Sequence, residues 1–376
     1  MSKINIIFAI RSLSIGGAER QFIELVKGIN KRKFNVLVCS MSTGILDTEI
    51  SGIESINLKC FNKKGRYDIR SYYKYIQTIK KFKPHIIYSF LSDLNLISFI
   101  CSKISSSKSK LVWGIRGSIP DQNLYGAFAK MIFNFQKFIS SEIDLIIFNS
   151  YVAEKKHRLA GFHPKCSAVI QNGIDSKRFF NNHFLRENFR LKYGLKSTDI
   201  AIGITSRIDP IKGYVEFCTA AANLLKKYPN VAFFSIGYGD NDIQKKCEHI
   251  LSGSNQTRFY WLGKHLKPEY FMPGWDIYCS ASLPGEGFPN AIAEAMLCEL
   301  APVVTDSGDS KMIVSEVGLV ANCGDAADLE SKLEEMIRNH HLKDIGLKSR
   351  ERILKFFSID KMVDATEEDL IKIAVR

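Results

Sequence analysis

Residues 200–213 read Ile200-Ala-Ile-Gly-Ile-Thr205-Ser-Arg207-Ile-Asp-Pro210-Ile-Lys212-Gly213. An apolar run of strand length is followed by a short loop shaped by Pro210 and Gly213, and the loop carries two cations. The arginine fork of Arg207 and the point charge of Lys212, placed at the end of one strand, suit a diphosphate. Surface Lys and Arg are common, so this loop by itself does not identify a ligand.

The pattern of residues 200–205 recurs along the chain. Apolar runs of strand length alternate with longer segments of helical period, which predicts parallel sheets covered by helices. After Asn172-Gly-Ile-Asp175, a turn-rich stretch from Ser176 to Asn182 interrupts the rhythm. We therefore expect an α/β protein with two doubly wound domains. The predicted strands are residues 4–10, 34–41, 85–90, 110–115 and 144–148 before the interruption, and 200–205, 231–236, 259–262, 277–279, 301–305 and 318–320 after it.

The length of the chain also favours two domains. At 376 residues it exceeds the size at which one hydrophobic core usually suffices. The expected domains are residues 1–173 and 174–357, followed by a final helix over 358–376. The sequence does not decide which domain that helix packs on, and packing back on the first domain is our expectation. The content of 45% apolar and 24% charged residues is that of a soluble globular protein.

Targeting and redox signals point to the cytoplasm. No apolar run reaches the roughly 18 residues that span a bilayer. Residues 4–10 lack a small-residue cleavage site and are interpreted as a first strand. The nine cysteines form no Cys-x-x-Cys pair, so we predict reduced, packed thiols, with neither a zinc site nor a disulfide framework. Those inside apolar segments include Cys39, Cys218, Cys279 and Cys298.

The net charge of +13 is unevenly distributed. Residues 1–170 carry 26 Lys and Arg against 11 Asp and Glu, whereas residues 171–376 carry 26 against 28. A basic half suggests a nucleic acid, an anionic membrane surface or a phosphorylated substrate as partner.

Two segments of the basic half mix cations with aromatic residues. At helical spacing, residues 63–83 suit either an interfacial helix on anionic lipid or a solvated helix that packs its aromatic stripe on a sheet. Residues 125–139 carry aromatics on more than one helix face, which favours contact with the acceptor or with lipid over an ordinary buried helix. The apolar residues of this second segment include Phe128, Met131, Ile132, Phe133, Phe135 and Phe138.

A Gly-Gly sequence follows the first predicted strand and opens the first helix. Gly16 and Gly17, in Ser14-Ile-Gly-Gly-Ala-Glu-Arg20, permit a tight turn and close approach of the backbone to a ligand. Free N–H groups and the helix dipole would favour an anion there. The dinucleotide-binding pattern Gly-x-Gly-x-x-Gly is absent, and a Gly-Gly turn by itself is most often only a turn.

Two glutamates stand eight positions apart in Gly285-Glu286-Gly-Phe-Pro-Asn-Ala-Ile-Ala-Glu294. The helix around Glu294 is otherwise apolar, so this carboxylate needs a partner, either a ribose diol or a structural cation. Glu286 directly follows Gly285 and precedes the helix, with Pro289 suited to its first turn. It is therefore expected to project into the mouth of a cleft. Two cations and two carboxylates in one cleft would hold a nucleotide sugar.

In this order along the chain, the motifs resemble those of the retaining glycosyltransferases of family four. That family has two facing Rossmann-like domains with a cleft between them, the fold called GT-B. The resemblance spans about residues 4 to 320. It is carried by Gly16 and Gly17; by Arg207 and Lys212; by Glu286 and Glu294, with seven residues between them; and by Asn172-Gly-Ile-Asp175 and Pro302-Val-Val-Thr-Asp306.

The resemblance implies where the donor phosphates bind. Arg207 and Lys212 would hold the diphosphate of a nucleotide sugar, most simply a UDP-linked hexose. Gly16 and Gly17 would bring the first domain against the donor. Fixed cations favour the transition state, because negative charge develops on the departing diphosphate. No metal or other cofactor is expected for that task.

The resemblance also implies how the sugar is held. Glu294 would bind ribose hydroxyls and Glu286 the hexose, while the backbone N–H groups of Gly287 and Phe288 would contact phosphate or sugar. Pro289 lacks an N–H, so a family contact made by that amide is lost here. The acceptor hydroxyl would attack on the face that the leaving group vacates, with retention of configuration. No covalent nucleophile is expected, since Glu286 orients the sugar.

One position departs from the family. Many relatives have a histidine in the loop after the fourth strand of the first domain, where this chain has Trp113-Gly-Ile-Arg116-Gly-Ser118. An arginine is always charged and cannot act as a general base. We expect Arg116 to neutralise diphosphate or to hold an anionic acceptor. Three other histidines are alternatives, although none of them stands in a comparable loop: His85, His157 and His163.

The sequence therefore predicts hexose transfer to a hydroxyl of a glycan or lipid-linked glycan during synthesis of a bacterial surface polysaccharide, such as the O-antigen of lipopolysaccharide. The expected location is the inner face of the cell membrane, with peripheral attachment and no nucleic-acid partner. A nucleotide-sugar epimerase or a phosphorylase shares the same two-domain shell and remains an alternative. A basic membrane-binding protein without activity would explain the charge, but not the placement of the polar residues. The expected catalytic residues are Glu286, Arg207, Lys212 and Arg116.

Overall fold

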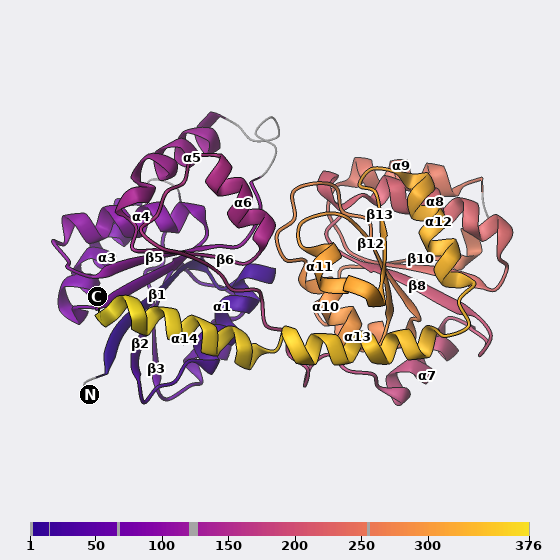
Figure 1. Ribbon diagram of the computed structural model, residues 1–376, viewed down its shortest axis with the longest axis horizontal. Helices are drawn as coiled ribbons and strands as arrows, with labels where there is room; N and C mark the ends of the chain where they lie inside the picture. Colours follow the sequence, from indigo (N-terminus) through magenta and orange to yellow (C-terminus); the bar gives the residue numbers. More distant parts are fainter. Residues whose placement is uncertain (1–2, 15, 66–67, 120–126, 254–255, 376) are drawn as a thin grey trace. The chain divides into compact units, whose positions relative to one another are not determined.

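The computed structural model describes residues 3–14, 16–65, 68–119, 127–253 and 256–375. The chain forms two compact units (Figure 1). Unit 1 comprises Met1–Gly173 and Ile359–Arg376, and unit 2 comprises Ile174–Ser358. The chain thus enters unit 2 after Gly173 and returns to unit 1 after Ser358.

Unit 1 contains a parallel sheet of seven strands in the order β3-β2-β1-β4-β5-β6-β7. The five predicted strands are confirmed, with ends that shift by up to two residues. The edge strands β3 and β7 were missed because β3 alternates apolar with polar residues and β7 has only three residues. The strands are β1 (Ile4–Ser12), β2 (Phe34–Ser42), β3 (Ile56–Cys60), β4 (Ile86–Phe90), β5 (Lys110–Ile115), β6 (Leu145–Phe148) and β7 (Ser167–Val169).

Helices cover both faces of the first sheet (Figure 1). One core contains side chains of α1, α2 and α14, with Phe22 and Met362 among them. The other contains side chains of α3, α4, α5 and α6, with Tyr75 and Phe99 among them. The helices are α1 (Gly17–Gly28), α2 (Asp47–Ser51), α3 (Ile69–Phe82), α4 (Ser92–Ile104), α5 (Ala127–Ile139), the 3-10 turn η1 (Ser140–Glu142), α6 (Tyr151–Leu159) and α14 (Ile359–Val375).

The final helix, α14, belongs to unit 1. Met362 and Val363 pack into the core beside α1, and the Glu367 carboxylate accepts a hydrogen bond from the Asn30 N–H and pairs with Lys33 at 3.0 Å. Gly28 on α1 lies so close to Val363 that a Cβ at this position would meet the valine at 2.5 Å. These contacts join the last residues of the chain to its first helix.

Unit 2 contains a parallel sheet of six strands in the order β10-β9-β8-β11-β12-β13. All six predicted strands are present, and three of them have the predicted bounds. Those three are continuous apolar runs, as expected for strands buried on both faces. The strands are β8 (Ile200–Thr205), β9 (Val231–Ile236), β10 (Phe259–Gly263), β11 (Ile277–Ser280), β12 (Ala301–Thr305) and β13 (Leu319–Ala321).

The second sheet also has a helical layer on each face (Figure 1). Helices α8, α9 and α12 pack on one face, and α7, α10, α11 and α13 on the other. The helices are α7 (His183–Lys192), α8 (Tyr214–Lys227), α9 (Asn241–Leu251), α10 (Asn290–Leu297), α11 (Ser310–Val314), α12 (Ala326–Ile337) and α13 (Leu342–Phe356). The 3-10 turns are η2 (Pro210–Lys212), η3 (Gln256–Arg258), η4 (Pro268–Tyr270), η5 (Met272–Gly274) and η6 (Ser315–Val317).

The two basic aromatic segments differ in what they bury. On α3, Tyr75 is buried and hydrogen-bonded to Ser98 of α4 at 3.2 Å, so its aromatic stripe packs inside unit 1. On α5, Met131, Phe135 and Phe138 are exposed at positions i, i+4 and i+7. Parts of both predicted segments lie outside the described residues, namely 66 and 67 of the first, and 125, 126 and the Phe128 side chain of the second.

Two further sequence inferences have structural counterparts. Cys39, Cys218, Cys279 and Cys298 are buried free thiols, as predicted. Across the described parts of the chain, no helix combines the length and the apolar character needed to cross a membrane.

Candidate functional site

The predicted donor residues lie at the carboxyl edge of the second sheet. The strand order of unit 2 reverses between β8 and β11, and open α/β sheets bind ligands outside the carboxyl ends of the strands at such a point. Arg207 and Lys212 follow β8, and Glu286 follows β11. The topology therefore brings together two loops that are more than seventy residues apart in sequence.

Lys212 and Glu286 form an ion pair through Nζ and Oε1. The same carboxylate oxygen accepts a hydrogen bond from the Ser282 hydroxyl at 2.9 Å. Both charged side chains are largely buried, with 19% of Lys212 and 13% of Glu286 exposed. Sequence reasoning missed Ser282, although its position two residues after β11 places it at the same sheet edge. The loop after β8 thus supplies the cation of the pair, and the loop after β11 supplies both the carboxylate and the hydroxyl group that holds it.

Local geometry holds the loop after β8 against the loop after β11. Asp209 caps the turn η2, since its Oδ1 accepts the Ile211 N–H at 3.2 Å. Gly213 has φ +64° and lies so close to the chain after β11 that an added Cβ would be 1.8 Å from the Ala281 carbonyl oxygen. The Leu283 N–H donates to the Ile211 carbonyl at 2.8 Å. Only glycine satisfies both the conformation and the contact at position 213.

The Glu286 loop is supported from behind by the segment after β12. Gly308 has φ +58°, and a Cβ there would be 2.3 Å from the Gly287 carbonyl oxygen. The Asp309 N–H donates to the same carbonyl at 2.9 Å. The Phe288 side chain is buried and packs on Phe357 at 5.4 Å between ring centroids. These contacts fix the backbone around the Glu286 carboxylate.

Arg207 differs from Lys212 in being open to solvent. Its side chain is 68% exposed and is paired with Asp209 at 3.5 Å, a weak contact. Beside it, the Thr205 and Ser206 hydroxyl oxygens are buried, and neither has a hydrogen-bond partner among the described residues. The carboxyl end of β8 thus presents one solvent-exposed cation and two hydroxyl groups that have no hydrogen-bond partner among the described residues.

Glu294 is half-buried on α10, which begins at Asn290 with Pro289 as its N-cap residue, one position before the predicted first turn. Its charge acts on Arg178 and on Tyr278, whose hydroxyl donates to the Thr205 carbonyl at 3.3 Å. The charge of Glu294 thus acts on a tyrosine whose hydroxyl is hydrogen-bonded to the last residue of β8.

Arg178 is a cation that sequence reasoning did not single out. It follows Asp175 in the turn-rich stretch and pairs with Glu269 at 2.9 Å. Burial alone would lower the pKa of Arg178, but the hydrogen bond to Glu269 and the charges of Glu269, Glu294 and Asp175 raise it above its ordinary value. Its only sequence signal is a position just after the expected interruption of the strand pattern.

In unit 1, Gly16 and Gly17 begin α1 as predicted. Gly16 is the N-cap residue with extended backbone, at φ −173°, and its carbonyl accepts the Arg20 N–H at 3.0 Å. Four residues further, the Gln21 amide forms two hydrogen bonds with the backbone of Gly173, at 2.9 and 3.1 Å. These hydrogen bonds attach α1 to Gly173, the last residue of unit 1 before the chain enters unit 2.

Arg116 follows β5 at the carboxyl edge of the first sheet. Its guanidinium group stacks over the Phe90 ring, 4.4 Å from the centroid. Nη1 donates to the Asn172 side-chain oxygen at 3.4 Å, a long hydrogen bond, and the buried Nε has no partner among the described residues. Burial lowers the pKa of Arg116, and the nearby Tyr88 hydroxyl partly offsets this effect.

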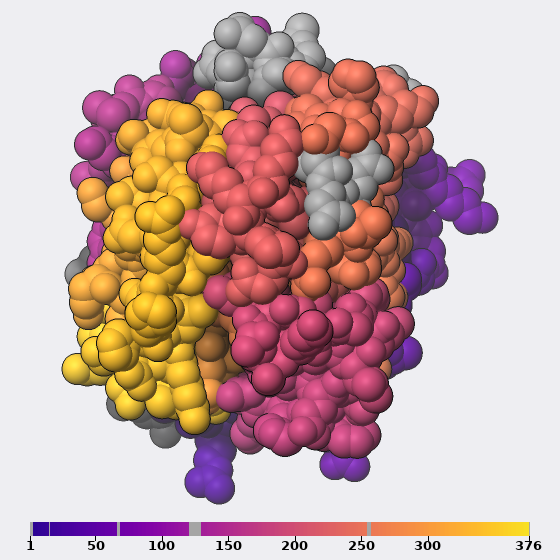
Figure 2. Space-filling model, turned by 90° about the vertical axis from the view of Figure 1, so that its right-hand side faces the viewer, coloured from indigo at the N-terminus to yellow at the C-terminus, as the bar shows by residue number. Residues whose placement is uncertain are grey.

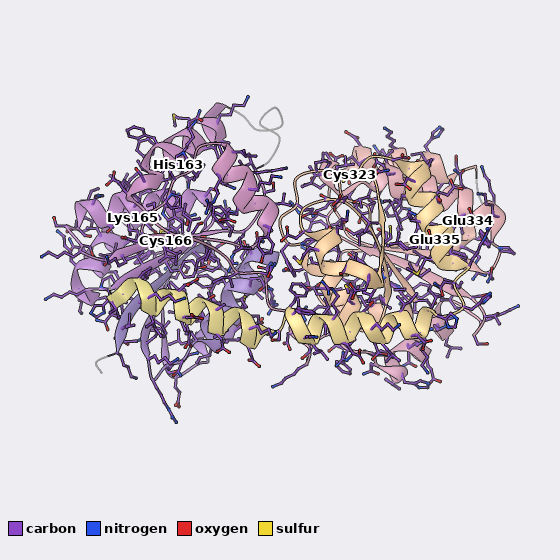
Figure 3. The ribbon with its side chains drawn as sticks, viewed as in Figure 1. His163, Lys165, Cys166, Cys323, Glu334 and Glu335 are labelled. Carbon is purple, nitrogen blue, oxygen red and sulfur yellow. The ribbon has the colours of Figure 1, made fainter. Side chains whose placement is uncertain are left out.

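The three other histidines lie away from these residues. His85 precedes β4 at the amino edge of the sheet and accepts the Asn5 N–H at 2.8 Å. His157 is buried on α6 among aromatic rings, where burial lowers its pKa to about 4. His163 lies on the segment before β7 (Figure 3). None of them stands in the position of Arg116.

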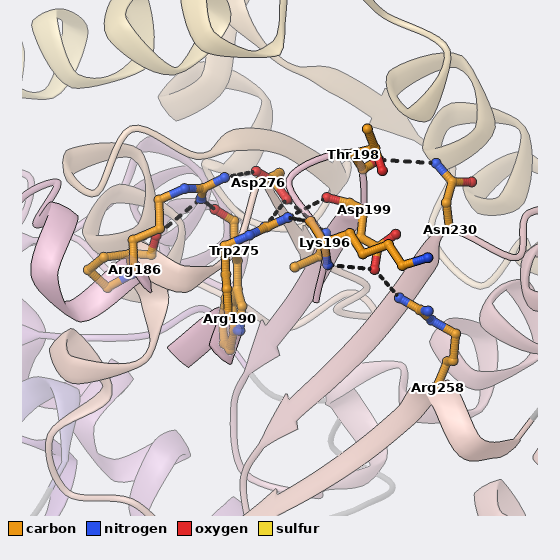
Figure 4. A network of polar contacts seen from close by, with 11 residues as sticks. Arg186, Arg190, Lys196, Thr198, Asp199, Asn230, Arg258, Trp275 and Asp276 are labelled. Atoms are coloured by element: carbon orange, nitrogen blue, oxygen red, sulfur yellow. Dashed lines mark hydrogen bonds and ion pairs between the residues drawn. The ribbon is translucent and has the colours of Figure 1, made fainter. Parts of the chain in front are cut away.

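The amino edge of the second sheet has a separate structural network. Asp276, just before β11, binds Arg186 at 2.5 Å and Arg190 at 3.1 Å (Figure 4). Arg190 also donates to the carbonyl oxygens of Lys196 and Asp199, at 2.6 and 2.7 Å. A cavity of about 520 Å³ borders Asp276 between α7 and α13, which adjoin on the face seen in Figure 2. It lies at the sheet edge opposite the candidate donor site.

Possible metal ligands are dispersed over the described residues. No group of three or more His, Cys, Asp or Glu residues that could hold a metal ion occurs within the described ranges. One Asp-x-Asp sequence, Asp240-Asn-Asp242, begins α9. The Asp240 carboxylate accepts the N–H groups of Asp242 and Ile243, at 2.9 and 3.1 Å. Helix capping accounts for its presence.

Two family models match the chain, one for each sheet. Residues 15–178 match the model described as Glycosyltransferase Family 4, and residues 199–339 match the model described as Glycosyl transferases group 1. The first covers the Gly-Gly loop and Arg116, and the second covers Arg207, Lys212 and both glutamates.

Individual proteins extend the likeness over the whole chain. It is 21% identical to the UDP-Gal:alpha-D-GlcNAc-diphosphoundecaprenol alpha-1,3-galactosyltransferase of Escherichia coli, covering 100% of this chain and 98% of the relative. It is 23% identical to an uncharacterized glycosyltransferase of Methanocaldococcus jannaschii, covering 71% and 69%. The crystal structure of Anabaena HepE with UDP-glucose superposes with a TM-score of 0.83 at 21% identity, covering 98% and 100%. This likeness confirms the fold class, two Rossmann-like domains of the GT-B type.

Proposed function

Because the chain is a glycosyltransferase of the family 4 and group 1 type, we propose that it transfers a hexose from a UDP-linked donor with retention of configuration. The acceptor is a hydroxyl group of a glycan or lipid-linked glycan. The observation that carries the proposal is the Lys212–Glu286 pair, fixed by Ser282 at the switch point of the second sheet.

The donor site is assigned to the carboxyl edge of unit 2. Arg207 and Lys212 hold the diphosphate, and the unused hydroxyl groups of Thr205 and Ser206 are available as further donors. Glu294 binds the ribose hydroxyls. The assignment also includes donor contacts from Gly16 and Gly17 of unit 1 and from the backbone N–H groups of Gly287 and Phe288.

The charges at this edge suit departure of a diphosphate. Breaking the anomeric bond leaves negative charge on the leaving group, and Arg207 is exposed and weakly paired, so it can turn toward that charge. Lys212 stays between Glu286 and the phosphate, while Glu286 orients the hexose. The acceptor hydroxyl attacks from the side of the leaving group, and a diphosphate oxygen takes its proton. In this proposal the two cations do the work without a metal, so activity persists in the presence of EDTA.

Unit 1 receives the acceptor. The relative from Escherichia coli acts, by its name, on a diphosphoundecaprenol-linked sugar. For this chain we infer the same class of lipid-linked glycan and a role in surface polysaccharide synthesis. An epimerase or phosphorylase on this fold is disfavoured, because both halves match glycosyltransferase models.

A screen of nucleotide sugars tests the donor assignment. Ligands that bind only the folded state raise its stability, so UDP and one or more UDP-hexoses should raise the melting temperature, whereas GDP and CDP sugars should have smaller effects. NMR analysis of the product anomer then tests retention. Transfer with inversion, or epimerisation of the donor without an acceptor, would contradict the proposed reaction.

Two variants test the division of tasks within the site. Glu294→Ala should weaken UDP binding, whereas Arg207→Ala should mainly lower turnover, by roughly a hundredfold, since it removes one preorganised partner of the leaving group. Lys226→Ala, at an exposed lysine in the last turn of α8, serves as the control. Unchanged UDP binding and transfer in both site variants would exclude this assignment.

Membrane attachment is assigned to α4 and α5 of unit 1. Met131, Phe135 and Phe138 form an exposed apolar stripe, with Phe138 79% exposed, and Ile100 and Ile104 are exposed on the neighbouring helix. Lysines on the same two helices would face the phosphates of an anionic bilayer, each worth about 1 kcal/mol when well placed. These lysines are Lys103, Lys130 and Lys137.

Liposome sedimentation tests this surface. The protein should bind vesicles with anionic lipid more strongly than neutral vesicles, and the double substitution of Phe135 and Phe138 by Ser should abolish the difference. The same change at Phe184 and Leu191, two exposed apolar residues on α7 of unit 2, is the matched control. Equal binding to both kinds of vesicle would contradict the assignment.

A further inference from the structure

Arg116 is a cation that has no counter-ion among the residues that the structure describes. None of the ion pairs within the described ranges includes it, and within those ranges it donates one hydrogen bond, the long one to Asn172. By contrast, the buried Arg190 of unit 2 pairs with Asp276 and donates to two carbonyl oxygens. Arginine remains charged in proteins, and a charge removed from water without a partner is costly.

The surroundings of Arg116 are fixed in place. Phe90 at the end of β4 supports the guanidinium group from one side, and the Phe22 ring of α1 packs edge-on against Phe90 with centroids 5.0 Å apart. Asn172 is adjacent to Gly173, which the Gln21 amide holds through two hydrogen bonds. The guanidinium group is therefore positioned by three separate segments of unit 1.

Unused hydroxyl groups accompany the cation. Tyr88 is two residues before Phe90 on β4, and its ring packs on Phe90 with centroids 4.7 Å apart, so Tyr88 and the Arg116 guanidinium group contact the same ring. The buried Tyr88 hydroxyl and the buried Ser118 hydroxyl have no hydrogen-bond partners among the described residues. Buried polar groups in folded proteins are usually hydrogen-bonded, so two hydroxyl groups without a partner in the described ranges, near a half-buried cation, call for a ligand. A planar arginine fork and hydroxyl donors suit an oxyanion.

We infer that Arg116, supported by Phe90 and Asn172 and assisted by Tyr88 and Ser118, binds an oxyanion of the acceptor, either a phosphate of its lipid carrier or a sugar carboxylate. The inference rests on the proposed function, in which unit 1 receives the acceptor. It assigns a substrate class to that site: an acceptor that carries a negative charge close to the reacting hydroxyl. The oxyanion is assigned to the acceptor because, in the proposed function, Arg207 and Lys212 of unit 2 already bind the diphosphate of the donor.

The side-chain N–H signal of Arg116 reports this interaction directly. Full-length protein, saturated with UDP to fill the donor site, is titrated with a short-chain prenyl diphosphate, with glucuronate, and with inorganic phosphate, and the Nε–H signal is followed by NMR. An oxyanion should shift that signal saturably. A response to the prenyl diphosphate but not to glucuronate identifies a carrier phosphate, and the reverse identifies a sugar carboxylate.

Variants separate recognition from structure. Arg116→Gln should weaken binding of the responding anion by about tenfold or more, because it removes a charge-assisted hydrogen bond. Arg116→Lys should restore only part of it, since lysine cannot form two parallel hydrogen bonds. Arg158→Gln, at an exposed arginine of α6 that pairs with Glu154, should leave the affinity unchanged.

Two outcomes would overturn the inference. One is a shift of the Arg116 signal by UDP itself, with no further response to any added anion, which would assign Arg116 to the donor. The other is the absence of a response to every anion. UDP binding is measured separately by thermal stabilisation, so its absence would count against the proposed donor site, while UDP binding without an anion response would reject only the Arg116 inference.

Discussion

Lys212 and Arg116, at the carboxyl edges of the two sheets, differ in whether a carboxylate compensates their charge. In unit 2, Lys212 is largely buried and has Glu286 as its counter-ion, and Arg178 has Glu269. In unit 1, Arg116 is buried at its Nε and has no carboxylate partner among the described residues. The desolvation cost of a compensated cation is offset by its partner before any ligand arrives, whereas an uncompensated cation keeps a cost that a ligand can relieve.

The largest expected effect comes from breaking the compensated pair. Lys212→Met leaves the Glu286 carboxylate, 13% exposed, without its cation and should destabilise unit 2 by about 3 kcal/mol. Adding Glu286→Gln should recover most of this stability but none of the lost transfer activity. Urea denaturation and donor turnover of the two variants measure both effects. Additive losses of stability would show that the pair is not coupled.

A second contrast concerns the glycines that shape the two edges. Gly213→Ala combines a positive φ with a Cβ placed 1.8 Å from the Ala281 carbonyl oxygen, so we expect a loss of about 3 kcal/mol. Gly16→Ala has extended backbone and meets only the flexible Glu19 carboxylate, so its loss should stay below about 1 kcal/mol. Thermal denaturation of both variants gives the comparison, and equal losses would contradict it.

Acid should affect unit 1 through His157. Burial lowers the folded-state pKa of His157 to about 4, so the unfolded chain takes up the proton first. The stability contribution is complete above the ordinary pKa of about 6.5 and falls as pH drops toward 4, by about 2 kcal/mol between pH 7 and pH 4.5. Hydrogen exchange of unit 1 amides at these two pH values measures the loss. His157→Gln should reduce this dependence, whereas His249→Gln, at an exposed histidine of α9, should not.

The smallest expected change in stability is a gain, in contrast to the losses above. Arg116→Gln removes a cation that has no counter-ion among the described residues but also removes its stacking on Phe90, so unit 1 without ligand should become more stable by about 1 kcal/mol. Arg190→Gln, at the paired arginine of unit 2, should instead destabilise by about 3 kcal/mol. Urea denaturation of the two variants without ligand measures both changes. A loss of stability in both variants would contradict the difference between the arginine without a carboxylate partner and the paired one.

Much of the fold was predictable because buried parallel strands are continuous apolar runs. Residues 110–115, 200–205, 231–236 and 301–305 form strands with the predicted bounds. The edge strand β3 was missed because Asn57 and Lys59 interrupt its apolar pattern. The aromatic residues of α3 and α5 look alike in sequence, yet Tyr75 is buried and Phe138 is exposed. Helical period alone does not say which helix finds a neighbour.

The sequence by itself determined the residue types of the site and their order, because strand–loop–helix alternation places glycines, cations and carboxylates after strands. Only the tertiary structure decided how those charges are paired. Lys212 and Glu286 meet because β8 and β11 are neighbours in the sheet, a contact across 74 residues that no local pattern specifies. Likewise, only the folded chain brings Ser282 to Glu286 and places Tyr88 beside Phe90, over which Arg116 stacks. Charge compensation depends on distance in space, so the difference between Lys212 and Arg116 emerges only when the chain is folded.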